Sequence, residues 1–116
     1  MPRISKRFNE NKRALVDIDE TICFYPNQRI YTRAKPNFKN INKINQLKRE
    51  GWHITYWTGR GGHSHIDYTD LTKSQLKKWG CLHDNLILGY NENPNYPVKP
   101  SFDLVVDDKA KRIEEL

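Results

Sequence analysis

The chain has 116 residues, a formal net charge of +6 and 36% hydrophobic residues. This length suits one domain of about 100 to 150 residues and excludes two. No run of about 18 apolar residues is present, which excludes a membrane-spanning helix, and two cysteines are too few for a disulfide scaffold or a zinc ribbon. The N-terminus lacks the apolar stretch of a secretory signal, so we expect a cytoplasmic protein with no membrane partner.

Most of the net positive charge lies in the first 13 residues, where five basic side chains and one acidic side chain give +4 of the total +6. We expect residues 1–13 to form a basic leader and residues 14–116 to form a single domain. Such a leader can bind phosphate backbones, although a solvated terminus often has the same composition. Nucleic acid is therefore a candidate partner through this leader.

The first predicted elements are a strand, a hairpin and a helix. The apolar run over residues 14–18 has no helical spacing, which predicts a buried parallel strand. Aromatic and β-branched residues with a Pro-Asn turn signal predict a hairpin or flap over residues 21–35. Apolar residues at three-residue intervals over residues 38–47 predict an amphipathic helix that ends at Gly51.

The second half of the chain continues the alternation of strands and helices. Its predicted elements are a strand over 53–57, a helix over 70–79, strands over 85–88 and 102–106, and a short last helix over 110–116. A polar, glycine-rich loop over residues 58–62 follows the second strand, a layout typical of phosphate sites. The order predicts an α/β fold, a three-layer, Rossmann-like and mainly parallel sheet with helices on both faces.

Polar residues follow three of the predicted strands at their carboxyl ends, where sheets of this kind bind ligands. These residues, which we expect to meet at one site, are Asp17 and Asp19, Thr58 and Gly59, and Asp107 and Asp108. Four carboxylates would repel one another without a cation. Because all the donors are oxygen atoms, the cluster suits Mg²⁺ better than zinc.

The pair of carboxylates after the first strand suits phosphoryl transfer. One carboxylate, Asp17, can attack phosphorus, while its neighbour Asp19 acts as general acid and base. Such transfer also needs donors to the phosphoryl oxygens, and the candidates are Thr58, the backbone amides of Gly59 and Arg60, and Lys99. The Arg60 side chain fits either a substrate contact or a solvated position.

Four short motifs carry a resemblance to a known family. In chain order they are Asp17-Ile18-Asp19-Glu20-Thr21, Thr58 at the end of the second strand, Lys99 before the last strand, and the acidic pair Asp107-Asp108. Together they resemble the motifs of haloacid dehalogenase (HAD) superfamily phosphatases. The resemblance extends from Asp17 to Lys109 and therefore covers most of the chain.

The resemblance implies a role for each motif residue. Asp17 would be the nucleophile and a magnesium ligand, and Asp19 would be general acid and base while binding Mg²⁺ through its carbonyl. Thr58 and Lys99 would hold the phosphoryl oxygens, with Lys73 as a substitute for Lys99. The metal shell would be completed by Asp107 and Asp108, of which Asp108 equally fits a helix cap.

The predicted function is Mg²⁺-dependent hydrolysis of a phosphomonoester through a phospho-aspartate intermediate. The substrate would be a sugar phosphate or a nucleic acid 3′-phosphate. The gaps between the motifs leave no room for the cap domain of many HAD members, and capless members act on large substrates or borrow a lid from a second subunit of a homo-oligomer. The alternative function is a non-catalytic module that binds phosphate or nucleic acid.

Overall fold

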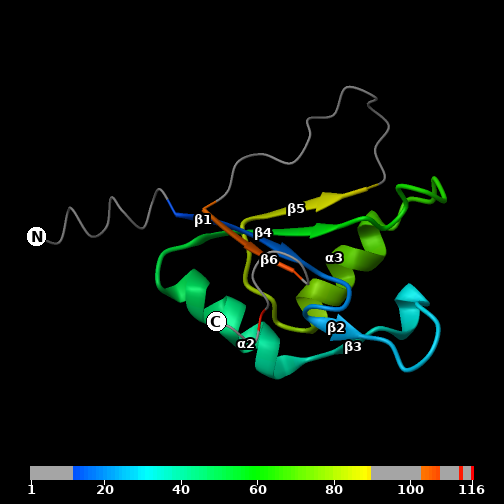
Figure 1. The fold of residues 1–116 in the computed structure, drawn as a ribbon. Helices are drawn as coiled ribbons and strands as arrows, with labels where there is room; N and C mark the ends of the chain where they lie inside the picture. The colour runs from blue at the N-terminus through cyan, green and yellow to red at the C-terminus, as the bar shows by residue number, and fades with distance from the viewer. Residues whose placement is uncertain (1–11, 90–102, 108–112, 114–115) are drawn as a thin grey trace, which may run out of the picture.

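The computed structural model describes residues 12–89 and 103–107, together with Ile113 and Leu116. These residues form an α/β fold around a four-stranded parallel sheet with the strand order β5-β4-β1-β6 (Figure 1). The strands are β1 (Arg13–Asp17), β4 (His53–Thr58), β5 (Asn85–Leu88) and β6 (Leu104–Val106). The prediction of four strands in a parallel sheet is thus confirmed for this part of the chain.

Two helices connect the first three of these strands. Helix α2 (Phe38–Arg49) begins at Asn37, whose side chain accepts the Asn40 N–H at 3.1 Å and so caps the helix. The α2 helix ends before Gly51, which has a φ of +99°, and α3 (Thr69–Lys78) ends before Gly80, which has a φ of +71°. Both glycines stand where the chain needs a left-handed backbone to leave a helix, as the sequence predicts.

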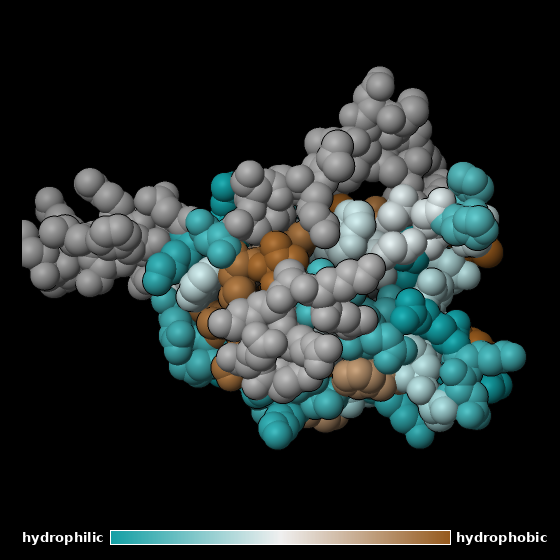
Figure 2. Space-filling model, in the orientation of Figure 1, coloured by the Kyte–Doolittle hydropathy of each residue, from teal (hydrophilic) through white to brown (hydrophobic). Residues whose placement is uncertain are grey.

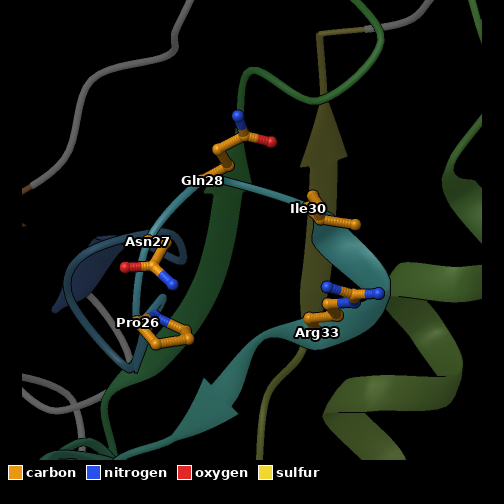
Figure 3. A pocket seen from close by; sticks show the side chains of 5 residues that line it. All are labelled: Pro26, Asn27, Gln28, Ile30 and Arg33. Carbon is orange, nitrogen blue, oxygen red and sulfur yellow. The ribbon is translucent and has the colours of Figure 1, made fainter.

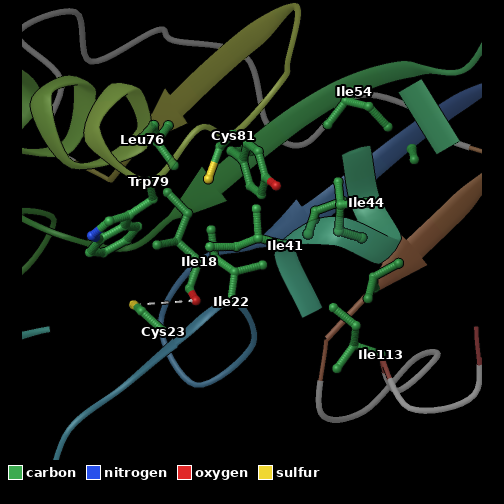
Figure 4. Packing of buried hydrophobic residues seen from close by; sticks show 14 residues of the cluster. Ile18, Ile22, Cys23, Ile41, Ile44, Ile54, Leu76, Trp79, Cys81 and Ile113 are labelled. Atoms are coloured by element: carbon green, nitrogen blue, oxygen red, sulfur yellow. Dashed lines mark hydrogen bonds between the residues drawn. The ribbon is translucent and has the colours of Figure 1, made fainter. Parts of the chain in front are cut away.

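The main core lies between the sheet and these two helices. Strands β1 and β4 contribute alternate residues to it, and the helices contribute apolar residues from one side (Figure 4). Its members include Ala14, Val16, Ile41, Ile44, Ile54, Tyr56, Leu76 and Trp79. Going from β1 to β4 to β5, the chain adds each new strand on the same side of the previous one. Right-handed crossovers between strands added in this way lie on the same face of the sheet. This explains why α2 and α3 cover the same face.

The opposite face of the sheet also carries buried residues where the structure describes it. Leu15 is 1% exposed and Thr55 is 2% exposed, and both alternate with residues of the main core. Figure 2 shows hydrophilic residues over most of the visible described surface, with an apolar area close to β1 and β6. Since the described helices cover one face only, the three-layer arrangement remains a prediction.

A small hairpin follows β1 and confirms the predicted flap. Strands β2 (Cys23–Phe24) and β3 (Lys35–Pro36) pair in antiparallel fashion, and the 3₁₀ turn η1 (Tyr31–Arg33) precedes β3. Between β1 and β2 the chain makes a tight turn, in which the N–H of Ile22 donates to the carbonyl oxygen of Ile18 at 3.0 Å. Glu20 in this turn has a φ of +65°, a conformation that non-glycine residues rarely adopt.

Some predicted features lie outside the described residues. They are most of the leader over 1–13, the first residue of the strand predicted over 102–106, and most of the helix predicted over 110–116. Among the residues that the structure does describe, no helix is long and apolar enough to span a membrane. Cys23 and Cys81 are buried free thiols within the core, as expected for packing roles.

A surface carboxylate joins α2 to the sheet. Asp84 accepts a hydrogen bond from Lys48 Nζ at 2.7 Å and another from the Ile54 N–H at 2.8 Å. Partial burial raises the pKa of Asp84, but the bonds from Lys48 and from the backbone outweigh this effect and hold the pKa below its usual value. The ionised form is therefore the one that stabilises the fold.

We expect Asp84→Asn to lower the free energy of unfolding by about 1 kcal/mol at neutral pH, because it removes a charge-assisted hydrogen bond. A carboxyl group with a lowered folded-state pKa stabilises above its unfolded pKa of about 3.9, and this contribution disappears as the pH falls through the folded value. Urea denaturation at pH 7 and pH 3 measures the difference. An equal loss at both pH values would contradict the role of the charge.

Candidate functional site

The candidate site lies at the carboxyl end of β1, where the direction of the sheet changes. The chain passes from β1 to β4 and β5 on one side, and β6 then pairs on the other side of β1. Ligands of such sheets bind at this switch point, beyond the carboxyl ends of the two strands that flank it. Here those two strands end at Asp17 and immediately before Asp107.

Asp17 and Asp107 lie level with each other on neighbouring strands. The register pairs Val16 with Val106, and each aspartate is the next residue of its chain segment. Neighbouring strands are about 5 Å apart, so the two carboxylates share one end of the sheet. Both residues are partly buried, and Asp17 Oδ1 accepts the Ile18 N–H at 2.9 Å. The predicted proximity of these two residues is consistent with this register.

Asp19 occupies a different environment two residues further on. It is 8% exposed, and its carboxylate accepts five hydrogen bonds from four side chains, one of them from Cys23 Sγ to Oδ1 at 3.7 Å. Tyr25 Oη donates to Oδ1 at 2.5 Å and Thr58 Oγ1 donates to Oδ2 at 2.9 Å. Arg60 donates from Nη2 to Oδ1 at 2.9 Å and from Nε to Oδ2 at 3.2 Å, which makes a two-pronged ion pair.

Arg60 is itself fully buried and held by a second set of contacts. Its Nη1 donates to Gln75 Oε1 at 2.6 Å and to Thr72 Oγ1 at 3.1 Å, so α3 fixes the orientation of the guanidinium. The Tyr31 ring lies against the guanidinium with its centroid at 4.7 Å, in cation–π geometry. A solvated Arg60, one of the two predicted alternatives, is therefore wrong, because burial requires the charge to be paired with Asp19.

The ion pair and its burial change the pKa values of Asp19 and of the neighbouring side chains Tyr25 and Cys23. Burial raises the pKa of Asp19, but the hydrogen bonds from Arg60 and Tyr25, together with the charge of Arg60, hold that pKa below its usual value. Burial, and then the hydrogen bond to Asp19, raises the pKa of Tyr25. Burial, and then the negative charge of Asp19, raises the pKa of the Cys23 thiol to about 12. The cluster therefore contains a carboxylate, a neutral phenol and a neutral thiol at neutral pH.

Thr58 and Gly59, predicted to bind phosphate, lie beside this ion pair. The Thr58 hydroxyl donates its proton to Asp19 and accepts the Arg60 N–H at 3.2 Å. Gly59 begins a tight loop in which its carbonyl oxygen accepts the Gly62 N–H at 3.0 Å. A Cβ atom on Gly89, just after β5, would lie 2.6 Å from the Gly59 carbonyl oxygen, so only glycine fits there.

Two predicted site residues, Lys99 and Asp108, lie outside the described residues. The predicted substitute for Lys99, Lys73, is exposed on α3 and lines a surface hollow with Lys77 and residues 81–86, which include the loop before β5 and the first two residues of that strand. That hollow adjoins the amino end of β5, whereas the candidate site lies at the carboxyl ends of the strands. The structure therefore gives Lys73 no place in the site.

Three residues of the site carried no signal in the sequence. Tyr25 lies in the hairpin, where an aromatic residue also suits packing. Thr72 and Gln75 lie three residues apart on α3, next to the buried Leu76, and both are buried themselves. When polar residues lie on the apolar side of a predicted helix, they can indicate that a buried charged group packs against that side.

The donor chemistry suits Mg²⁺, which proteins commonly bind through one or two carboxylates together with water and substrate oxygen atoms. Asp17 and Asp107 supply two carboxylates at one end of the sheet, and the motif resemblance would add the backbone carbonyl of Asp19. Within the described part of the chain, no group of three or more His, Cys, Asp or Glu residues is arranged to hold a metal ion. The fourth predicted ligand, Asp108, lies outside that part.

We expect Arg60→Met to lower the free energy of unfolding by about 3–5 kcal/mol, because it leaves the Asp19 carboxylate buried without its cation. The double variant Asp19→Asn/Arg60→Met should lose much less than the sum of the two single variants. Urea denaturation of the four proteins gives this cycle. Additive losses would show that the two side chains do not stabilise each other.

Comparisons with known proteins support the fold alone. No protein-family model matches the chain, and no curated protein matches it either. Among solved structures, the chain is similar to an MCSG target protein from Vibrio cholerae, with a TM-score of 0.66 and 20% sequence identity. The match covers 90% of this chain and 85% of that chain. At this identity the likeness shows a shared α/β architecture.

Proposed function

We propose that the protein is a Mg²⁺-dependent phosphomonoester hydrolase that works through a phospho-aspartate intermediate on Asp17. The observation that carries this proposal is the placement of Asp17 level with Asp107 at the switch point, two residues before the buried Asp19–Arg60 ion pair. The motif resemblance to HAD phosphatases supports the same activity. A capless, HAD-like arrangement of three layers is the corresponding fold, with the hairpin β2–β3 beside the site.

Asp17 performs the nucleophilic step in the proposed reaction. One of its carboxylate oxygens attacks the phosphorus atom, the bond between phosphorus and the ester oxygen breaks, and the leaving alcohol takes up a proton. Water then attacks the phosphorus of the acyl phosphate, which releases inorganic phosphate and restores Asp17. The hydrogen bond from the Ile18 N–H to Asp17 Oδ1 fixes the direction of the nucleophilic carboxylate.

Asp19 acts as acid and base in the two steps. The hydrogen bonds from Arg60, Tyr25 and Thr58 favour the carboxylate form of Asp19, which is the form that accepts a proton from the attacking water. Donation to the leaving alcohol requires a protonated Asp19, and the same hydrogen bonds oppose that state. When the Thr58 hydroxyl turns from Asp19 to a phosphoryl oxygen, Asp19 loses one donor and its proton affinity rises.

The resident metal would be held by Asp17, Asp107 and the Asp19 carbonyl, with Asp108 as the fourth predicted ligand. When bound, Mg²⁺ neutralises the negative charge that gathers on the phosphoryl oxygens. On the side of the chain itself, the amides of Gly59 and Arg60 and the predicted Lys99 add donors for those oxygens. The substrate class remains a sugar phosphate or a nucleic acid 3′-phosphate, the latter with the basic leader as a contact.

We expect Asp17→Asn to lower phosphate release by about a thousandfold or more while leaving the fold intact, because the amide cannot act as the nucleophile. The assay compares sugar phosphates, nucleotides and a 3′-phosphorylated oligonucleotide, with Mg²⁺ and with EDTA. Asp70→Asn, at an exposed position of α3, is the matched control and should keep full activity.

The outcomes of this assay separate the two candidate functions. Release that requires both Mg²⁺ and Asp17 identifies a hydrolase and ranks its substrates. Steady-state release by Asp17→Asn at the wild-type rate would exclude the covalent mechanism. Binding of phosphate esters by a folded wild-type protein that hydrolyses none of them would identify the alternative, a non-catalytic binding module.

A further inference from the structure

The tip of the hairpin forms an open surface pocket that the proposed chemistry does not use. Its volume is about 310 Å³, and its lining residues are Pro26, Asn27, Gln28, Ile30 and Arg33. Figure 3 shows Pro26 and Asn27 on one arm of the loop and Ile30 and Arg33 on the other, with Gln28 at the bend. This volume is near the lower end of the range for pockets that bind small molecules.

Both ends of this loop are attached to the Asp19–Arg60 ion pair. Tyr25, immediately before the pocket residues, donates to Asp19 at 2.5 Å and accepts a hydrogen bond from Arg60 Nη2 at 3.2 Å. Tyr31, within the same loop, stacks against the Arg60 guanidinium, and its carbonyl oxygen accepts a hydrogen bond from Gln75 Nε2 at 2.6 Å. The loop that forms the pocket is therefore held against Asp19 and Arg60 of the candidate site.

The lining residues define the chemistry of a ligand. Asn27 and Gln28 each carry an amide that can donate to and accept from hydroxyl groups. Arg33 brings a positive charge, and among the described residues it makes no ion pair, whereas Arg29 of the same loop pairs with Glu20 at 3.6 Å. An unpaired arginine in a pocket with two amides suits a hydroxylated molecule that carries an anionic group.

We propose that this hairpin pocket binds the leaving group of the substrate and selects polyhydroxy alcohols that carry a second anionic group, either a carboxylate or a second phosphate. The inference rests on the proposed hydrolase function, because the pocket is placed relative to the nucleophile of that reaction. Asn27 and Gln28 bind hydroxyl groups of the leaving alcohol, and Arg33 binds its anionic group. The Tyr25 and Tyr31 contacts keep the pocket in register with Asp19.

Steady-state kinetics with three substrates test the proposal. They are glucose 6-phosphate, gluconate 6-phosphate and glucose 1,6-bisphosphate, which differ in the presence and type of the second anionic group. We expect the wild-type kcat/KM to be about tenfold or more higher for at least one of the anionic pair, since a charge-assisted hydrogen bond has that effect. The preferred member of the pair shows whether a carboxylate or a phosphate is recognised.

Arg33→Gln should remove this preference through KM, with kcat unchanged, and should leave glucose 6-phosphate unaffected. The matched control is Lys35→Gln, which removes a positive charge from the exposed part of the same hairpin outside the pocket. An equal loss on all three substrates would assign Arg33 a structural role instead. Absence of any preference in the wild type, or an unchanged preference in Arg33→Gln, would also overturn the proposal.

A binding measurement separates this inference from the hydrolase itself. Gluconate 6-phosphate and glucose 1,6-bisphosphate are each titrated into the EDTA-treated wild-type protein and Arg33→Gln, and the amide NMR signals of residues 23–36 are followed. Shifts that depend on Arg33, in a protein that shows no turnover with Mg²⁺, would support the pocket and refute the hydrolase. Turnover without such shifts for either compound would support the hydrolase and refute the pocket.

Discussion

The buried ion pair between Asp19 and Arg60 is the interaction on which the rest of the site depends. A carboxylate and a guanidinium can leave water together only when hydrogen bonds satisfy their remaining donors and acceptors. Here those bonds come from the hairpin, from the end of β4 and from α3. Three separate segments are therefore brought to one point by the need to keep two charges paired.

The two carboxylates at the carboxyl end of β1, Asp17 and Asp19, are two residues apart in the chain but have different surroundings. Asp17 stands at the end of the strand, partly exposed, next to the neighbouring strand that carries Asp107. Asp19 lies within the tight turn after the strand and is surrounded by donors. Different surroundings give paired carboxylates different proton affinities, and in the proposed reaction this difference would let Asp17 attack phosphorus while Asp19 transfers protons.

The sequence predicts the frame of this site better than its interior. Short apolar runs predict the strands and apolar spacing predicts the helices, because both reflect which residues are buried, and the Pro-Asn turn signal predicts the hairpin. The positions of Asp17, Asp107 and Thr58 follow from the ends of those strands. The pairing of Arg60 with Asp19 could not be predicted in this way, because a loop after β4 and a turn after β1 come together only in the folded chain. Lys99 and Asp108 lie outside the described residues, so their predicted roles remain untested.

The polar residues of α3 are a second feature of the site that the sequence pattern did not predict. Thr72 and Gln75 weaken the amphipathic pattern of that helix, and a reading based on apolar periodicity treats them as exceptions. In the structure they are the reason that the helix can face a buried cation. Here the polar exceptions to the hydrophobic pattern, and not the pattern itself, indicate where the buried ion pair contacts the helix.

The contact between Gly89 and Gly59 extends the site beyond its own side chains. The end of β5 lies directly against the loop that carries Arg60, and even a methyl group at position 89 would press on the Gly59 carbonyl oxygen. Which residues can replace Gly89 therefore depends on the shape of the loop that begins at Gly59, although Gly89 is not part of that loop. In a survey of all single variants, this glycine would group with the charged residues of the site, although it has no side chain with which to contribute.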